Sequence, residues 1–315
     1  MQKKFIRAIV ILVAAILIIG GYFLFKKDSL AFGPYVKIPD IYVSNNRYAI
    51  NYEQNSKRYI NLNGKVFGPY SAIKIDSITD KNEAFAYLDP DTNEWYINLN
   101  GNISGAWENI GDMSVSENKM GFSYLSNGKW YAKIENKQYG PYDSIGGLAI
   151  SDKDYIFSFE RDNKKYILIN GEESGPYDNV EKVSTNNMGT GFIYYQGDEK
   201  YVNIDDRIYG PYSVSVPIYL FNNGFAFQYF DQNDLMVNIN DVIMGPYEAV
   251  GILPNSQFAS FYFVKGGRSY ISTSTKIYGP YPYEFIGGAV SGNEVGIGYQ
   301  ARDGWNVLIS RGQIK

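Results

Sequence analysis

The chain of 315 residues contains no cysteine and no histidine. Without cysteine there is no disulfide framework, no thiol nucleophile and no thiolate metal site. Without histidine the chain lacks the commonest general base and the commonest zinc ligand. The sequence therefore predicts no catalytic residue, no cofactor and no metal-binding residue, although glycoside hydrolysis by a pair of carboxylates would need no histidine.

Helical periodicity is absent after residue 27, whereas aromatic residues make up 17% of the chain, with 30 Tyr and 18 Phe. That composition favours a β-rich globular protein and excludes wholesale disorder. Residues 1–27 hold five positive side chains and no acid, and the remainder carries 24 positive and 33 negative side chains. An acidic body disfavours nucleic acid as a partner.

A run of 18 uncharged residues, Ala8–Phe25, is rich in Ile, Leu, Val and Ala. A helix of this length just spans the hydrocarbon core of a bilayer. The alternative is a cleaved signal peptide, but the run is longer than is usual there and Lys26 and Lys27 follow it. The sequence favours residues 1–30 as a cytoplasmic tail, an uncleaved single-pass anchor and a short linker. The preceding basic residues place the body, residues 31–315, outside the cytoplasm.

One tripeptide recurs through the rest of the chain. Gly-Pro-Tyr occurs seven times, and Gly105-Ala106-Trp107 takes its place once. Successive glycines lie 34 to 37 residues apart, and a fixed period of this length indicates a stacked or ring-shaped array. The motif glycines are Gly33, Gly68, Gly140, Gly175, Gly210, Gly245 and Gly279.

Residues 143–177 illustrate one unit, which predicts four short strands joined by hairpins. The dipeptide Asn170-Gly171 is typical of a tight turn of the primed kind before the fourth strand. The expected strands are Ile145–Ser151, Tyr155–Glu160, Tyr166–Asn170 and Glu172–Tyr177. Eight units follow from the spacing: 36–70, 71–107, 108–142, 143–177, 178–212, 213–247, 248–281 and 282–315.

The last unit supplies only three expected strands, and one strand, Ala31–Tyr35, stands before the first unit. This pattern is typical of a ring whose final sheet is completed by both ends of the chain, which also protects sheet edges. The sequence therefore predicts an all-β fold, an eight-bladed β-propeller closed by the N-terminal strand. The three expected strands are Ile286–Ser291, Val295–Gln300 and Trp305–Ser310.

The turn between the first two strands of a unit carries a family resemblance. One example is Val115-Ser116-Glu117-Asn118-Lys119-Met120-Gly121, and Val43–Ala49, Ile150–Ile156 and Val290–Gly296 are similar. These segments resemble the Ser-Pro-Asp-Gly-x-x-Ile-Ala-Phe signature of TolB-like, WD40-like propeller repeats. They lack its proline and its usual glycine, and no Trp-Asp dipeptide occurs in the chain. The resemblance implies a propeller with a binding role and carries no catalytic residue over.

The recurring motif has a structural explanation. Gly and Pro would shape the outer strand, while the Tyr ring packs between sheets and its hydroxyl reaches a backbone partner.

The acidic stretch Asp89–Glu94 has alternating oxygen ligands but lacks the glycine of a calcium loop, so we expect a solvated turn. Few acids fall in expected inner strands, namely Asp76, Asp112 and Glu181.

These features favour a membrane-anchored, extracytoplasmic, non-enzymatic binding or scaffold module, because loops on a rigid frame are where recognition usually lies. The expected partner is a protein or a cell-envelope component. One alternative is a glycan-binding propeller that uses Tyr and Trp as sugar platforms. Another is an envelope enzyme acting on polysaccharide, which would need two carboxylates converging at the central channel or on one face.

Overall fold

The computed structural model describes residues 37–311 apart from 45–46, 214–217, 223, 254–259, 273–276, 282–284, 292–293 and 302–303. Within these ranges no helix has the length and apolarity needed to cross a bilayer. The expected anchor, Ala8–Phe25, and the expected closing strand, Ala31–Tyr35, lie outside the described residues.

The described strands form eight antiparallel sheets, seven with four strands and one with three, and each sheet takes its strands in chain order. The first two sheets are β1 (Lys37–Ser44), β2 (Arg47–Gln54), β3 (Lys57–Leu62), β4 (Lys65–Tyr70), and β5 (Ala72–Ile78), β6 (Glu83–Leu88), β7 (Trp95–Leu99), β8 (Asn102–Trp107). The next two are β9 (Asn109–Val115), β10 (Met120–Ser126), β11 (Lys129–Ile134), β12 (Lys137–Tyr142), and β13 (Ser144–Ile150), β14 (Tyr155–Arg161), β15 (Lys164–Ile169), β16 (Glu172–Tyr177).

The fifth and sixth sheets are β17 (Asn179–Asn186), β18 (Gly189–Gln196), β19 (Glu199–Ile204), β20 (Arg207–Tyr212), and β21 (Tyr219–Phe221), β22 (Gly224–Asp231), β23 (Asp234–Ile239), β24 (Val242–Tyr247). The last two are β25 (Ala249–Leu253), β26 (Ser260–Lys265), β27 (Arg268–Ser272), β28 (Ile277–Tyr281), and β29 (Phe285–Ser291), β30 (Glu294–Ala301), β31 (Gly304–Arg311). Each sheet falls within one of the units expected from the spacing of the motif.

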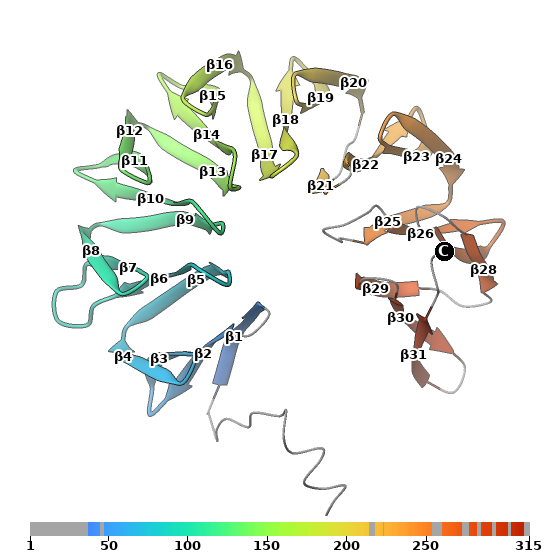
Figure 1. Cartoon of the computed structure of the whole chain (residues 1–315). Helices are drawn as coiled ribbons and strands as arrows, with labels where there is room; N and C mark the ends of the chain where they lie inside the picture. The colour runs from blue at the N-terminus through green and yellow to red at the C-terminus, as the bar shows by residue number, and fades with distance from the viewer. Residues whose placement is uncertain are drawn as a thin grey trace, which may run out of the picture.

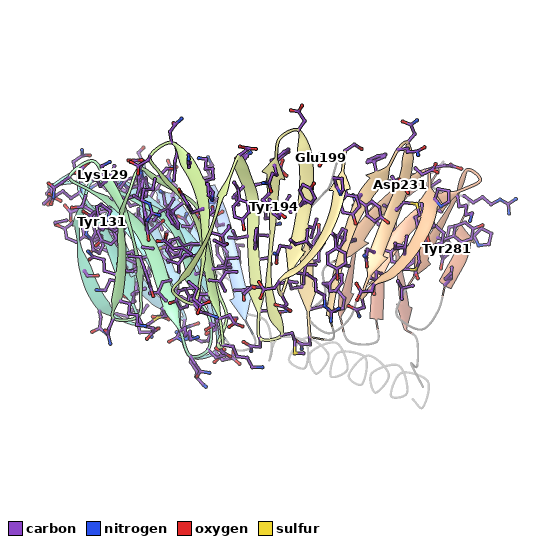
Figure 2. The ribbon with its side chains drawn as sticks, turned by 90° about the horizontal axis from the view of Figure 1, so that it is seen from above. Lys129, Tyr131, Tyr194, Glu199, Asp231 and Tyr281 are labelled. Atoms are coloured by element: carbon purple, nitrogen blue, oxygen red, sulfur yellow. The ribbon has the colours of Figure 1, made fainter. Side chains whose placement is uncertain are left out.

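The sheets follow one another around a common centre, with the first strand of each innermost and the last outermost (Figure 1). Inner strands of neighbouring sheets contact one another, as β5 does β9, β9 does β13 and β13 does β17. This radial arrangement is that of a β-propeller. Figure 2, turned by 90° from Figure 1, labels Lys129, Glu199 and Asp231, which lie beside the turns between the second and third strands of their sheets, all at one edge.

The hydrophobic core lies between sheets. The second strand of each of six sheets contributes a phenylalanine that is almost fully buried, and these are Phe85, Phe122, Phe157, Phe192, Phe227 and Phe261. Phe157, for example, packs with Ala132 and Ile134 of the preceding sheet. Fully burying such a side chain contributes about 1.5–3 kcal/mol, so the contact between sheets holds the array together.

The motif glycine occupies a place where a side chain would be strained. Gly140 has a φ of +117°, and a Cβ built on it would lie 2.8 Å from the carbonyl oxygen of Trp130 in the neighbouring strand. The Gly–Pro bond that follows is cis here and in five other motifs. In the Gly105-Ala106-Trp107 variant, a Cβ on Gly105 would lie 2.3 Å from Cδ1 of Tyr96. The glycine therefore admits a close approach of the outer two strands.

The motif tyrosine packs between sheets, as expected. Tyr70 stacks on Tyr87 of the next sheet at 4.2 Å between ring centroids, and Tyr87 stacks in turn on Tyr96 at 5.6 Å. The hydroxyl of Tyr177 donates to Oγ of Ser174, a side chain instead of the expected backbone acceptor. Equivalent contacts between sheets join Trp107 to Tyr124, Tyr142 to Phe159, Tyr177 to Tyr194, Tyr212 to Tyr229 and Tyr247 to Phe263.

We expect the protein to unfold in alkali because motif tyrosines are buried or half-buried between the sheets. Burial raises the pKa of Tyr70, Tyr142 and Tyr212 to about 12 from 10.0. The unfolded chain therefore loses these protons first, so stability is fully present below pH 10 and falls as the pH rises towards 12. We expect tyrosinate absorbance and the loss of circular dichroism to rise together across this interval. Complete tyrosine ionisation near pH 10 with an unchanged dichroism spectrum would contradict the prediction.

The turns that carry the family resemblance link neighbouring sheets. Asn82 Nδ2 donates to the carbonyl oxygen of Ser116 at 2.6 Å. One sheet further on, the backbone N–H of Asn118 donates to Asp152 Oδ1 at 2.8 Å, and that of Asp152 donates to Asn187 Oδ1 at 2.9 Å. These side chains therefore join consecutive inner hairpins along one edge of the array.

Candidate functional site

A cavity of about 470 Å³ opens between the sheet β13–β16 and the sheet β17–β20. Its volume falls within the range of about 300–1,000 Å³ typical of ligand pockets. We call it the acidic groove because five of its nine lining residues carry carboxylates. The lining residues are Asp154, Ile169, Asn170, Glu172, Glu173, Ser174, Thr190, Asp205 and Asp206.

The residue before the motif glycine helps to decide whether a groove between sheets is filled. In β20 this residue is Tyr209, whose ring lies 5.6 Å from that of Phe225. In β12 it is Tyr139, whose hydroxyl bonds that of Tyr155. In β16 it is Ser174, on the face of the sheet that packs against β18. The short serine leaves space where its counterparts place an aromatic ring.

Across the groove, Thr190 occupies the position that Tyr155 and Phe225 hold in their own sheets. Each of the three residues donates its backbone N–H to the side chain that opens the turn after the third strand. Thr190 is only 7% exposed, and its hydroxyl has no partner among the described residues. Two hydroxyl groups therefore stand where the neighbouring grooves place two aromatic rings.

A second cavity, of about 310 Å³, lies at the equivalent place between the sheets β5–β8 and β9–β12. Ser104 again precedes the motif glycine, but Leu99, Ile103, Met120 and Phe122 give this groove a more apolar lining. The same frame thus carries two grooves of different chemistry.

Some carboxylates of the acidic groove have partners within the protein. Asp205 Oδ1 accepts the backbone N–H of Thr190 at 2.8 Å, and Asp154 Oδ1 accepts Nδ2 of Asn170 at 2.7 Å. Glu173 forms an ion pair with Arg161 at 2.9 Å. Glu172 and Asp206, in contrast, have no ion-pair partner in the part of the chain that the structure describes. The groove therefore retains uncompensated negative charge.

Two of the three acids expected in inner strands are described. Glu181 lies in β17, where its Oε1 and Oε2 both accept Nζ of Lys200 at 3.0 Å. The hydroxyl of Tyr195 also donates to Glu181. Asp112 lies exposed in β9, and the side chain of Asp76 is outside the described set. Glu181 thus belongs to an ion pair with a lysine that is only 7% exposed.

Other acids shape turns. Asp89 Oδ1 accepts the backbone N–H groups of Asp91 and Thr92 at 2.9 and 3.0 Å, and these bonds, that from Thr92 foremost, lower the pKa of the Asp89 carboxyl. Asp143 and Asp178, which directly follow a motif tyrosine, accept backbone N–H groups from the next hairpin turn. Among the described residues no group of acids is arranged to hold a metal ion.

Aromatic residues also recur in the third strands. They are half-buried and, where a second-strand ring is present, stack on it; Tyr131, for example, lies 5.4 Å from Tyr124. The set comprises Tyr59, Tyr96, Tyr131, Tyr166, Tyr201 and Tyr270. These rings therefore have a structural role in each sheet as well as a partly exposed face.

Reasoning from the sequence did not identify the groove residues. A signal was present, because aligning the units places Ser104 and Ser174 in a column that otherwise holds Phe, Tyr or Met. This alignment shows that a small side chain replaces a large one, but it does not show which side chains of the next sheet lie opposite. Thr190 and Asp206 belong to the next unit, and only the packing of two sheets brings them to Ser174.

No protein-family model matches this chain, and no curated protein matches it in sequence. A solved prolyl endopeptidase is 10% identical with a TM-score of 0.45, over 88% of this chain and 55% of that one. The designed protein Ika8 is 12% identical with a TM-score of 0.45, over 88% and 96%. The propeller domain of the Trilobed protease from Pyrococcus furiosus is 10% identical with a TM-score of 0.41, over 89% and 94%.

The chain thus spans about half the length of that prolyl endopeptidase. At such identities the likeness concerns the fold alone. The arrangement of its own sheets makes the described part of this chain a β-propeller, similar to the propeller domains of peptidases and to WD40 domains.

Proposed function

We propose that the protein is a non-enzymatic binding module whose grooves between sheets recognise a protein or a cell-envelope component. One observation carries the proposal: equivalent grooves, at Ser104 and Ser174, share a frame but have different linings. Variation of side chains on a constant frame is the usual basis of recognition. The recurring carboxylates that cap turns have a structural role, which leaves the grooves as the variable part.

The proposal includes closure of the ring and attachment to a membrane. Gly33-Pro34-Tyr35 precedes β1, and the sheet β29–β31 has three described strands where the others have four. These facts support an eight-bladed, TolB-like propeller whose last sheet is completed by Ala31–Tyr35. The uncharged run Ala8–Phe25 supports a single-pass anchor that holds the propeller outside the cytoplasm.

Affinity purification of the solubilised full-length protein tests the proposed function when it is combined with variants that fill a groove. Ser174→Tyr and Ser104→Tyr each restore a large side chain found at the same position in other sheets. We expect a specific partner to accompany the unmodified protein and to be lost from at least one of these variants. Ser71→Tyr, at an exposed position, is the matched control. A partner retained by both groove variants, or no partner at all, would contradict the proposal.

A further inference from the structure

The groove that follows the acidic groove contains an ion pair between sheets. Arg207, the first residue of β20, places Nη1 3.0 Å from Oδ2 of Asp241 in the turn after β23. Tyr209 also donates to Asp241, at 2.7 Å between the two oxygens. An outer strand thus supplies a cation, and the next sheet supplies the carboxylate that holds it.

In the acidic groove the same two positions both carry acids. Glu172 is the first residue of β16, as Arg207 is of β20. Asp206 donates its backbone N–H to Asn203 in the same way that Asp241 donates to Asn238. A pair of opposite charges is thereby replaced by two like charges, which disfavour each other unless a cation lies between them. The positive group found in the neighbouring groove is absent from this position.

The cavity beside this pair has room and hydrogen-bonding groups for such a cation. Ser174 and Thr190 line it with hydroxyl groups, which can accept hydrogen bonds from N–H donors. Thr190 is buried apart from 7% of its surface and its hydroxyl has no partner among the described residues. A cavity of about 470 Å³ suits an organic group, and no described set of acids is arranged for a metal ion.

We propose that the acidic groove binds an organic cation, an ammonium or guanidinium group, which takes the place that Arg207 occupies in the next groove. Glu172 and Asp206 supply charge-assisted acceptors, and the hydroxyls of Ser174 and Thr190 accept further N–H donors. The inference deepens the proposed binding function and rests on it. A basic side chain of a partner protein or a free polyamine would present the same chemistry.

The test measures binding of a fluorescent hexalysine peptide and of spermidine to the full-length protein. In Glu172→Arg the new guanidinium can pair with Asp206, as Arg207 pairs with Asp241, and so occupies the site from within. We expect this variant to bind the peptide about tenfold more weakly or worse. Ser174→Tyr changes no charge but fills the cavity, and it should weaken binding similarly.

Asp234→Arg is the matched control, because it makes the same change of charge at the exposed first residue of β23, which pairs with Asp231 at the opposite edge of the sheets (Figure 2). It should leave the affinity within about twofold of the unmodified value. If spermidine displaces the peptide, a free amine is sufficient to occupy the site. If the peptide stays bound in the presence of spermidine, the ligand is a basic polypeptide. Both outcomes support the site.

Equal losses in Glu172→Arg and Asp234→Arg would overturn the proposal, because they would show diffuse attraction to an acidic surface. Absence of binding by both probes, or calcium binding in their place, would overturn it as well. The assignment can fail separately from the proposed function. A natural partner that binds Glu172→Arg but does not bind Ser104→Tyr would contradict the proposed cation site and would still support the proposed binding function.

Discussion

Replacing Gly140 by alanine should lower the free energy of unfolding by about 3 kcal/mol or more. Two effects add. The φ of +117° lies in a region that residues with a side chain rarely adopt, which costs about 1–3 kcal/mol. A Cβ would also lie 2.8 Å from the carbonyl oxygen of Trp130, and relieving such an overlap typically costs about 1–3 kcal/mol. Urea unfolding followed by tryptophan fluorescence measures the change.

Gly128→Ala is the matched control for this prediction. Gly128 also has a positive φ, of +69°, but nothing lies within 4 Å of a Cβ built there. Its substitution should cost about 1 kcal/mol, from the backbone conformation alone. Gly210→Ala should behave like Gly140→Ala, because its Cβ would lie 2.9 Å from the carbonyl oxygen of Lys200. Equal losses at Gly140 and Gly128 would show that the close approach of strands is unimportant.

Removing the proposed closing strand should destabilise the whole propeller, whereas removing the segment before it should not. A chain that begins at residue 31 keeps Gly33-Pro34-Tyr35, and a chain that begins at residue 36 loses it. Loss of an aromatic ring packed between sheets costs about 3–5 kcal/mol, and loss of a strand pairing exposes a further sheet edge. We expect the shorter chain to melt at a clearly lower temperature.

A variant of constant length separates closure from truncation. Changing Gly33, Pro34 and Tyr35 together to serine in the chain that begins at residue 31 should reproduce most of the loss. The same melting temperature for all three chains would show that residues 31–35 do not complete the last sheet, and the proposed closure would be wrong.

The sequence predicted the limits of the sheets well because the relevant signals are local. The fourth strand of the unit 143–177 was expected at Glu172–Tyr177, and β16 has these bounds. Asn170 and Gly171 both adopt a positive φ, of 53° and 98°, as a primed turn requires. Turn chemistry and a period near 35 residues therefore sufficed to divide the described chain into sheets.

The acceptor of a motif hydroxyl and the contents of the grooves were not predictable in this way. Tyr177 donates to Ser174, and this serine is available only because it stands where other sheets place a large side chain. Glu172 and Asp206 lie about one repeat apart in the sequence and line the same cavity through the packing of two sheets. A sequence pattern within one unit cannot show that these two residues line the same cavity.

The order of residues determined the strands, the turns and the role of the repeated glycine and aromatic residue, because each depends on neighbours within one hairpin. Tertiary structure alone decided which residues line the acidic groove. Two facing sheets bring together side chains from different units, so the charge and the volume of the groove between them depend on both sheets.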